Sequence, residues 1–554
     1  NLNQLKLRVV FYNLQVAQEI KKSNPTNTKE EIHALNVFLT RLLFCYFAED
    51  TDIFPNSNQF TNYLKNVSCE DGSDLHIHLE KLFYTLNSTN RDISNHLKEF
   101  PYVNGGLFKE VFAPLVFTKM SRNLIIECGA ELNWSLINPD IFGSMIQAVI
   151  SDEHRGTNGM HYTSVPNIMK VINPLFLDDL KESFENSKGN AKKLNELHKR
   201  ITNLKIFDPA CGSGNFLIIA YKELRKLEMD IFKSGQMLNM PSIKLSQFYG
   251  IELDDFAHEV AILSLWLAEH QMNQEFKKLF GNCTPTLPLQ DSGNIVCGNA
   301  TRLDWEEVCP KNEGDEIYIL GNPPYLGFNV QTDEQKQDIY FVLPETDNHK
   351  FLDYIVCWFV LGAKYIKGTN FQLAFVTTNS IAQGTQVPIV WTRIFNMNLE
   401  IGFTYPEFIW SNNAKDKAGV ICSIISLRNV QNKSKYIFSQ NIRKKVENIN
   451  AYLANSQNII IEKRQKPLSN LPSMSTGNIP YDGGNLIISE EEKNELESNY
   501  PESIIFIKQL SGSKEYINNL TRYCLWIEEE NIQLAYSIPP IKERIEKVKI
   551  SREN

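Results

Sequence analysis

The sequence predicts an α/β protein built on a mostly parallel, doubly wound, Rossmann-like sheet, with an all-helical domain before it and a mixed α+β segment after it. Three observations predict this order. Apolar residues recur at three- and four-residue steps in the first part of the chain. Short β-rich runs then alternate with helical stretches, and a polar segment with basic and acidic clusters follows. The length of 554 residues suits about three or four units of roughly 150 residues each.

Composition narrows the class of protein. With 42% hydrophobic and 22% charged residues, the chain is neither disordered nor a small binding module. Its longest apolar stretches, such as 354–363, are shorter than the ~18 to 20 residues that cross a bilayer, so no membrane span is expected. A net charge of -9 argues against coating nucleic acid by bulk electrostatics. The ten cysteines lack a Cys-x-x-Cys pair, which favours the cytoplasm and disfavours structural zinc.

The expected domains are 1–150, 151–430 and 431–554. In the first, Thr28 and Glu31 form a capping-box pattern, and glycines and a proline interrupt any helix at 100–108. That interruption is either a packed turn or a contact with substrate. Because the chain opens at Asn1 without methionine, a piece of a longer protein is expected.

The middle domain contains six predicted strands, each followed by a helical or turn segment. Strands alternating with helices form a largely parallel sheet whose carboxyl ends hold the functional loops. The six predicted strands are Leu204–Phe207, Phe248–Ile251, Ile295–Cys297, Tyr318–Leu320, Leu373–Thr377 and Ile421–Leu427.

A glycine turn follows the first of these strands and predicts a ligand site. Residues 206–217 read Ile-Phe-Asp-Pro-Ala-Cys-Gly-Ser-Gly-Asn-Phe-Leu, and no Gly-Lys-Ser/Thr follows, so the turn is not a phosphate-binding P-loop. Asp208 would repel pyrophosphate but suits a ligand with an ammonium or sulfonium group, such as S-adenosylmethionine. Glu252, which ends the second strand, can accept two ribose hydroxyls. Asn299, after the third, can pair with an adenine edge.

The fourth strand leads into Gly-Asn-Pro-Pro-Tyr at 321–325. Prolines lack N–H donors, so this corner offers acceptors, the Asn322 side-chain oxygen and the Pro323 carbonyl. An exocyclic amine with two N–H groups matches them, and Tyr325 offers a ring on which a flipped base can stack.

These residues resemble the amino-group DNA methyltransferases of the gamma class, whose Asp-Pro-Ala-Cys-Gly-Ser-Gly and Asn-Pro-Pro-Tyr motifs both occur here, in that order. The resemblance implies S-adenosylmethionine as cofactor and no metal. Thr163, in Gly-Met-His-Tyr-Thr-Ser, stands at the family's cofactor-closing position, although Ser164 replaces the usual proline; Asn299 stands where aspartate is common. The cofactor-binding positions implied are Thr163, Asp208, Pro209, Ala210, Gly212, Gly214, Glu252 and Asn299, and the catalytic positions are Asn322, Pro323, Pro324 and Tyr325.

The likeness extends to the methyltransferase part of single-chain type II (type IIL or IIG) restriction-modification enzymes. The segments that carry it are 38–55, 103–108, 410–415, 474–489 and 522–527. It implies that 431–554 is the start of a target recognition domain for double-stranded DNA. No Asp and Glu-x-Lys nuclease pair on strands is recognised before Ser151, so a nuclease domain or subunit is expected to be missing from this chain, or the protein is a solitary methyltransferase.

The implied activity is methylation of N6 of a flipped adenine in a restriction-modification or phage-defence system. Phe408 or Trp410, expected in a loop, could cover the second face of the base. Three alternatives stay open: a cytosine N4-methyltransferase, a protein-glutamine or RNA methyltransferase, and a catalytically idle DNA-binding defence subunit. A local basic patch must contact the DNA backbone, and the candidates for it are Arg443, Lys444, Lys445, Lys463 and Arg464.

Overall fold

The structure is a computed structural model. It describes residues 12, 15–24, 27–89, 94–103, 106–136, 163–235, 240–281, 293–344, 346, 348–409, 421–439, 442–462, 464, 469–470 and 482–553. Two compact units divide the chain, residues 1–463 and residues 464–554. Each is described separately.

The first part of unit 1 is helical, as predicted. The Thr28 side chain accepts from the Glu31 N–H at 3.2 Å and Glu31 Oε2 accepts from the Thr28 N–H at 3.1 Å, which confirms the capping box at the start of α2. By length and composition α2 could cross a membrane, but 72% of its apolar window is buried inside the protein, as in a core helix. The helices here are α2 (Lys29–Asp50), α3 (Gln59–Val67), α4 (Leu75–Asn87) and α5 (Lys119–Glu131).

The interruption at 100–108 is a packed turn wherever the structure describes it. Phe100 packs edge-on against Phe54 at 5.0 Å between ring centroids, and Phe108 lies 5.3 Å from Phe44. The Val103 N–H donates to the Leu86 carbonyl at 2.8 Å. Asn104 and Gly105, the alternative place for a substrate contact, lie outside the described residues.

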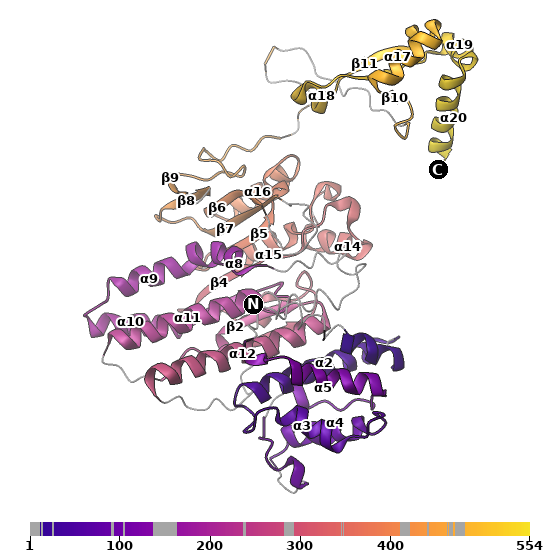
Figure 1. Ribbon diagram of the computed structural model, residues 1–554. Coiled ribbons are helices and arrows are strands. Elements are labelled where there is room, and N and C mark those ends of the chain that lie inside the picture. The colour runs from indigo at the N-terminus through magenta and orange to yellow at the C-terminus, as the bar shows by residue number, and fades with distance from the viewer. Residues whose placement is uncertain are drawn as a thin grey trace. The chain divides into compact units, whose positions relative to one another are not determined.

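One long helix, α12 (Asp255–Phe280), belongs to two hydrophobic cores. Phe256, Val260 and Trp266 pack into the core of the helical domain, which lies beneath α12 in Figure 1. Ala261 and Leu265 face the core of the sheet. Helical periodicity sets this division, because residues three and four apart share a face. The helical domain is therefore joined to the domain of the large sheet by a buried surface.

The sheet of unit 1 has nine strands in the order β3-β2-β1-β4-β5-β7-β6-β8-β9. β3 to β5 are parallel, and β7 runs antiparallel between β5 and β6. This is the predicted doubly wound fold. The strands are β1 (Leu204–Asp208), β2 (Phe248–Glu252), β3 (Asn294–Cys297), β4 (Glu316–Gly321), β5 (Gln372–Thr378), β6 (Leu399–Ile409), β7 (Ile421–Asn429), β8 (Lys435–Ser439) and β9 (Ile442–Val446).

All six predicted strands are present, but the sequence reasoning missed β6. Its register shifts twice against β7, between Ile401 and Thr404 and between Tyr405 and Phe408. Gly402 and Pro406 stand at those two irregularities and interrupt the alternating pattern that identifies a strand. Phe408 therefore lies on a strand and not in a loop, which corrects the prediction.

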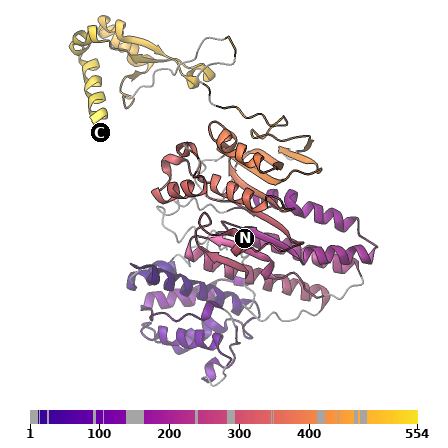
Figure 2. The same ribbon diagram turned by 180° about the vertical axis from the view of Figure 1, so that it is seen from behind.

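Helices cover both faces of the sheet (Figures 1 and 2). One face carries helices on a core built from Ile206, Phe248 and Leu320. The opposite face packs on Phe207, Ile319 and Phe375. Helices of the first face are α8 (Val165–Ile172), a π-helical turn (Asn173–Leu177), α9 (Asp178–Glu185), α10 (Ala191–Ile201), α11 (Asn215–Ser234) and α12; those of the second are α13 (Trp305–Val308), α14 (Asp333–Val342), α15 (Val356–Ile366) and α16 (Gln386–Asn396).

The sheet continues beyond residue 430, because β8 pairs with β6 and β9 pairs with β8. The domain boundary expected at residue 430 therefore falls inside the sheet. The two compact units of the chain instead meet in sequence after Lys463. Edge strands face solvent, so their polar composition resembles that of a linker.

Unit 2 is mixed α+β with a three-stranded sheet in the order β10-β12-β11. Its core includes Ile488, Phe506 and Leu525. Its elements are β10 (Ile487–Ile488), α17 (Glu490–Asn499), β11 (Ile507–Leu510), α18 (Ser513–Asn518), β12 (Arg522–Leu525), α19 (Ile532–Ser537) and α20 (Pro539–Glu553).

Candidate active site

The predicted site residues gather where the strand order of the sheet reverses. β1 has β2 on one side and β4 on the other, which is the point of a doubly wound sheet where the loops leave in different directions and form a crevice in folds of this class. Ligands of doubly wound folds bind in this crevice. Asp208 ends β1, Glu252 ends β2, and Asn322 follows β4.

The turn after β1 is shaped by two glycines in the left-handed region. Gly212 has φ +55° and Gly214 has φ +82°, and α11 begins at the next residue. A Cβ on Gly214 would lie 3.5 Å from Ala261 of α12, whereas one on Gly212 would meet no described atom within 4 Å. The turn is therefore packed on one side, and the described chain leaves open space beside Gly212.

Asp208 connects the ends of β1 and β4. Its side chain has no exposed surface, and its Oδ1 accepts from the Ala210 N–H at 3.1 Å. A Cβ on Gly321, the residue before Asn322, would lie 2.4 Å from Oδ1, so only glycine fits there. Burial, with a smaller contribution from Glu252, raises the pKa of Asp208 to about 8. Its Oδ2 is buried without a partner among the described residues.

Glu252 holds the glycine turn from the neighbouring strand. Its Oε2 accepts from the Gly212 N–H at 2.8 Å, and its Oε1 accepts from the Asp254 N–H at 2.8 Å. Burial nevertheless raises the pKa of Glu252 to about 7. Two carboxyl groups whose pKa values are raised by burial thus stand at the ends of β1 and β2, and a cationic or hydroxyl-bearing ligand would stabilise their charged forms.

The side-chain amide of Asn299 is hydrogen-bonded to neighbouring residues on its own side of the sheet. Its Oδ1 accepts from the backbone N–H and the hydroxyl of Thr301, at 2.9 and 2.7 Å, and its Nδ2 donates to Asp338 Oδ2 at 3.0 Å. Asp338 also accepts from Arg302 and Tyr354. An adenine edge would meet the remaining N–H of Asn299 but not its oxygen, so a contact between Asn299 and the cofactor stays a prediction limited to that one donor.

Asn322 and Thr163 meet although 159 positions separate them in the chain. Asn322 Nδ2 donates to Thr163 Oγ1 at 3.3 Å, which orients the amide. Asn322 Oδ1 is buried and has no hydrogen-bond partner among the described residues. A buried carbonyl oxygen without a donor costs free energy, which a donor from a ligand would recover. Ser164 stands at the N-cap position of α8 without a side-chain capping hydrogen bond, and the proline of this segment, Pro166, lies in the first turn of the helix.

Two aromatic side chains lie on either side of one cysteine. The Tyr325 hydroxyl and the Cys422 thiol are neighbours that interact electrostatically. Cys422 on β7 stands directly opposite Phe408 on β6. Tyr325 and Phe408, both predicted to stack on a base, therefore approach the same point of the sheet. Trp410 lies outside the described residues.

Sequence reasoning missed the side chains that hold the motifs in place. Trp358 Nε1 donates to the Pro209 carbonyl at 3.0 Å, and Asp353 Oδ1 accepts from the Leu326 N–H at 2.8 Å. Both residues come from the segment between α14 and β5, and no local motif marks them. Only the folded chain shows that Trp358 supports the glycine turn and that Asp353 supports the Asn-Pro-Pro-Tyr corner.

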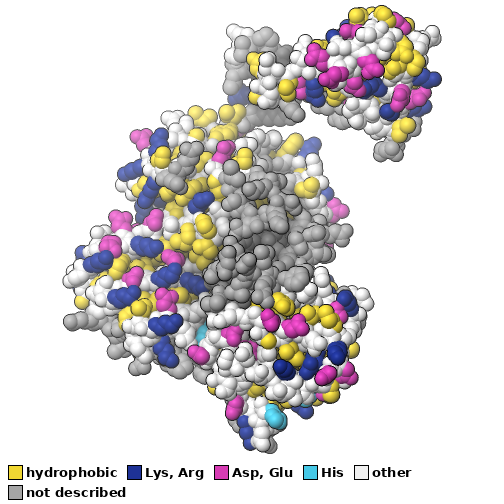
Figure 3. Space-filling view, viewed as in Figure 1, with side chains coloured by type: hydrophobic (Ala, Val, Ile, Leu, Met, Phe, Trp, Pro, Cys, Tyr) yellow, Lys and Arg dark blue, Asp and Glu magenta, His cyan; other side chains and the backbone are white. Residues whose placement is uncertain are grey.

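The predicted basic residues divide between the two units. Arg443, Lys444 and Lys445 are exposed on the edge strand β9. Figure 3 shows Lys and Arg side chains over this end of the sheet and over α9 to α11, where carboxylates are interspersed. Arg464 is exposed in unit 2, and Lys463 lies outside the described residues.

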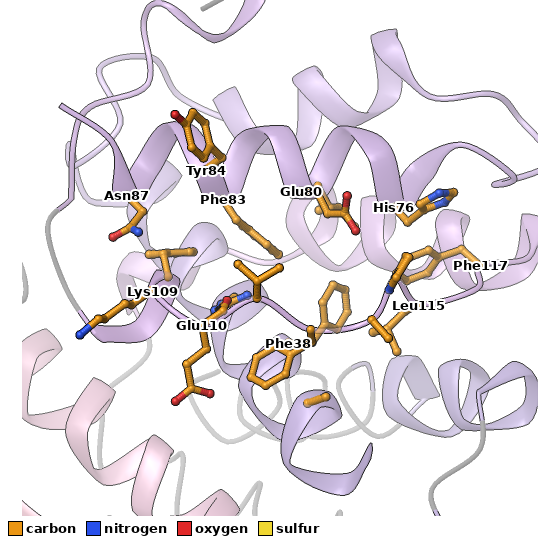
Figure 4. Close-up of a pocket in the computed structure, with 18 residues that line it drawn as sticks. Phe38, His76, Glu80, Phe83, Tyr84, Asn87, Lys109, Glu110, Leu115 and Phe117 are labelled. Carbon is orange, nitrogen blue, oxygen red and sulfur yellow. Dashed lines mark hydrogen bonds between the residues drawn. The ribbon is translucent and has the colours of Figure 1, made fainter. Parts of the chain in front are cut away.

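A cavity of about 270 Å³ lies in the helical domain and involves none of these residues (Figure 4). Phe38 and Phe83 form part of its wall, with ring centroids 6.2 Å apart. Arg41, which lines the cavity together with Lys109, donates to the Leu107 and Glu110 carbonyls at 2.7 and 2.8 Å. The chemistry predicted from the sequence therefore belongs to the sheet crevice and not to this cavity.

Comparison with known proteins finds family matches to three parts of the chain. Family descriptions match residues 184–439 (MmeI, DNA-methyltransferase domain), 455–554 (MmeI, target recognition domain) and 33–108 (MmeI, helicase spacer domain). The solved structure of the type IIL restriction-modification enzyme MmeI in complex with DNA has a TM-score of 0.88 and 38% identity, covering 98% of this chain and 74% of that one. The chain belongs to the MmeI-like family.

Curated relatives agree with this assignment. DNA methyltransferase A of Bacillus subtilis (strain 168) is 51% identical over 542 residues, which are 96% of this MmeI-like chain and 61% of the relative. The type II restriction enzyme and methyltransferase RM.Eco57I of Escherichia coli is 25% identical over 207 residues, 30% of this chain. The MmeI-like chain thus spans about three fifths of the length of DNA methyltransferase A.

Proposed function

We propose that this chain transfers a methyl group from S-adenosylmethionine to N6 of an adenine flipped out of double-stranded DNA. The observation that carries the proposal is the amide of Asn322: Thr163 takes its N–H, and its oxygen is buried and lacks a donor among the described residues. An acceptor held in this way fits an exocyclic amine, which has hydrogens to donate.

The crevice residues fit S-adenosylmethionine. Gly212 leaves open space where a Cβ would project, so a ligand can approach the backbone closely. The Asp208 carboxyl, whose Oδ2 has no partner among the described residues, can ionise beside an ammonium or sulfonium, and the Glu252 carboxylate suits two ribose hydroxyls. Thr163 would border the methionine end. When bound, S-adenosylmethionine supplies an electrophilic methyl group.

The residues of the Asn322 corner would orient the target amine. The Asn322 Oδ1 and the Pro323 carbonyl accept its two hydrogens and draw its lone pair out of conjugation with the ring. Tyr325, which lies next to Cys422, and Phe408, which stands opposite Cys422 on β6, would confine the base. Positioning of this kind supplies most of the rate acceleration when no covalent enzyme intermediate is needed.

DNA would reach the site along the β8–β9 edge. Arg443 lies over the Tyr436 ring at 3.8 Å, and Tyr405 stacks on Phe438 at 4.6 Å with the rings 10° apart. Phe408 lies 6.4 Å from Tyr405. A row of aromatic rings thus leads from the basic strand to the predicted base-stacking residue. Base specificity would come from the target recognition domain.

The motif favours adenine over cytosine, because cytosine N4-methyltransferases usually begin this motif with serine whereas this chain has Asn322. The cytosine enzyme remains the second candidate on chemistry, since its amine would use the same acceptors. Sequencing of DNA from cells that express the full-length gene, with a readout of modified bases, separates the two. N6-methyladenine at a fixed sequence is expected, and N4-methylcytosine would reverse the ranking.

The catalytic assignment is tested with Asn322→Ala. Single-turnover methyl transfer should fall about 10²- to 10³-fold, the usual cost of one group that acts on the transition state, while S-adenosylmethionine affinity stays near that of the unmodified protein. Asn329→Ala is the matched control, because Asn329 is exposed in the same loop. An unchanged transfer rate in Asn322→Ala would refute the assignment.

A further inference from the structure

Lys170 lies beside the predicted base-stacking residue. Its ammonium stands 4.4 Å from the centroid of the Phe408 ring, and it donates to Asn167 Oδ1 at 3.0 Å. Both Lys170 and Asn167 belong to α8, which begins two residues after Thr163. Helix α8 therefore brings a cation to the pocket where the target base would stack.

The charge of Lys170 has no carboxylate partner within the parts of the chain that the structure describes. Many other lysines of the catalytic domain have one; Lys188, for example, lies 5.0 Å over the Phe184 ring and also pairs with Glu185 at 2.7 Å. Lys170 is half-buried, and burial lowers its pKa. A desolvated cation without a counter-charge costs free energy, which an arriving anion would offset.

Asn167 adds a second donor at the same place. Its side chain is 4% exposed, and because Oδ1 accepts from Lys170, its Nδ2 is a donor. That Nδ2 is buried without a partner among the described residues. An ammonium and an unpaired amide N–H next to each other form a site for an anionic oxygen.

We propose that Lys170, with Asn167, binds a backbone phosphate next to the flipped nucleotide. This inference rests on the proposed function, because only a nucleotide that enters the pocket brings a phosphate close to Phe408. A base stacked against Phe408 remains tied to its own two phosphates, and a lysine side chain is long enough to follow one of them as the backbone rotates. Lys170 would hold the nucleotide in the flipped position and would read no sequence.

The test uses a duplex with the protein's own methylation site and 2-aminopurine in place of the target adenine. Lys170→Met should weaken binding roughly three- to tenfold and lower the slope of log affinity against log salt by up to about 0.9, as expected when one phosphate is no longer neutralised. The rise in 2-aminopurine fluorescence on binding should shrink. Lys170→Arg should restore both, and Lys188→Met, the matched control, should change neither.

Affinity for S-adenosylmethionine, measured by calorimetry without DNA, identifies the source of the anion. It should be unchanged in Lys170→Met, which also shows that the variant is folded. A large loss would mean that the anion is the cofactor's carboxylate and would overturn the proposal. An unchanged salt slope and fluorescence, in a preparation whose unmodified protein methylates DNA, would overturn the role of Lys170 alone. If the unmodified protein neither methylates nor flips the base, the proposed function fails first.

Discussion

The two ends of the crevice are built in different ways. At the proposed cofactor end, defined by Asp208, the glycine turn and Glu252, backbone groups of adjacent strand ends make most of the contacts, such as the Gly212 N–H to Glu252. At the proposed target-base end, defined by Asn322, Tyr325, Thr163, Phe408 and Lys170, contacts join segments far apart in the chain, such as Asn322 with Thr163 and Lys170 with Phe408. The first end is a local property of two strands and a turn, whereas the second exists only after the whole domain has folded.

The largest expected effect comes from Gly321→Ala, which acts where the two ends meet. The new Cβ would lie 2.4 Å from Asp208 Oδ1 at a φ of +153°, so either the strand end or the carboxyl must move. Overpacking and backbone strain together should cost about 3 kcal/mol, and transfer should be lost. Thermal denaturation and single-turnover assays measure the two effects.

Gly327→Ala is the control for this substitution. Its Cβ meets no described atom within 4 Å, and its φ of -64° suits any residue. It should leave the melting temperature nearly unchanged. Equal melting temperatures for Gly321→Ala and Gly327→Ala would show that Asp208 does not connect the ends of β1 and β4.

Gly212→Trp should break the cofactor end alone. The described chain leaves open space at this position, so the protein should fold, but the indole would occupy the place of the ligand. We expect S-adenosylmethionine binding to fall at least 100-fold by calorimetry, with about 1 kcal/mol of stability lost to the left-handed φ. Gly368 also has a positive φ and open space among the described residues, but it precedes the amino end of β5, whereas Gly212 follows the carboxyl end of β1; Gly368→Trp should therefore bind normally. Retained binding in Gly212→Trp would refute the assigned pocket.

The difference between the two ends explains what the sequence could predict. The six strands, the capping box at Thr28 and the meeting of Gly212 with Glu252 follow from local patterns and spacing. The partners of the target-base end do not, because Cys422 and Lys170 look like an ordinary strand cysteine and an ordinary helix lysine in sequence. Motifs identify residues that act through backbone geometry, whereas residues recruited by tertiary contact leave no local signal.

The basic and polar segments show the same limit. Polar composition after residue 430 predicted a separate domain, although β8 and β9 complete the sheet. The bulges at Gly402 and Pro406 hid β6 for a related reason, since each breaks the alternation of apolar residues. In both cases, the β8–β9 edge and β6, the strand forms because it pairs with neighbouring strands. The sequence of a single strand does not show this pairing.

The buried carboxyl groups of the proposed cofactor end predict that affinity for S-adenosylmethionine depends on pH. Burial raises the pKa of Glu252 from 4.5 to about 7 in the free protein. Hydroxyls of a bound ribose would favour the ionised form, so binding releases a proton, and affinity for S-adenosylmethionine should rise about tenfold from pH 6 to pH 8.

The stability of the protein without ligand should change with pH in the opposite direction to its affinity for S-adenosylmethionine. Because the pKa of Glu252 is raised in the folded protein, its neutral form adds to the free energy of unfolding. This contribution is complete below pH 4.5 and is lost as the pH rises through about 7. Stabilisation by the ligand should therefore grow with pH. Calorimetry in two buffers of different ionisation enthalpy counts the protons released, and Glu252→Gln should flatten the profile. A flat profile in the unmodified protein would contradict the assigned role of Glu252.

The smallest effect is expected at the β9 edge. Neutralising Arg443, Lys444 and Lys445 together to glutamine should weaken binding to all duplexes alike and reduce the salt slope by up to about 0.9 for each phosphate that is no longer neutralised. Sequence preference should survive, because phosphate contacts position DNA without reading it. The matched control neutralises exposed lysines of α10, namely Lys192, Lys193 and Lys199. An unchanged slope in the β9 variant would move the DNA path away from this strand.

Because α12 contributes to two hydrophobic cores, the helical domain and the catalytic sheet are not independent modules. Removing the helical domain would leave Phe256, Val260 and Trp266 in water, three large side chains that are at most 7% exposed in the intact chain. His33 of α2 also contacts the turn that follows Glu252, because its Nδ1 lies 2.8 Å from Asp255 Oδ2. Unfolding of α2 would therefore remove a contact that supports the Asp254–Asp255 turn. In evolution the two parts would have to be exchanged as one block, with any new junction placed outside the α2–α12 contact.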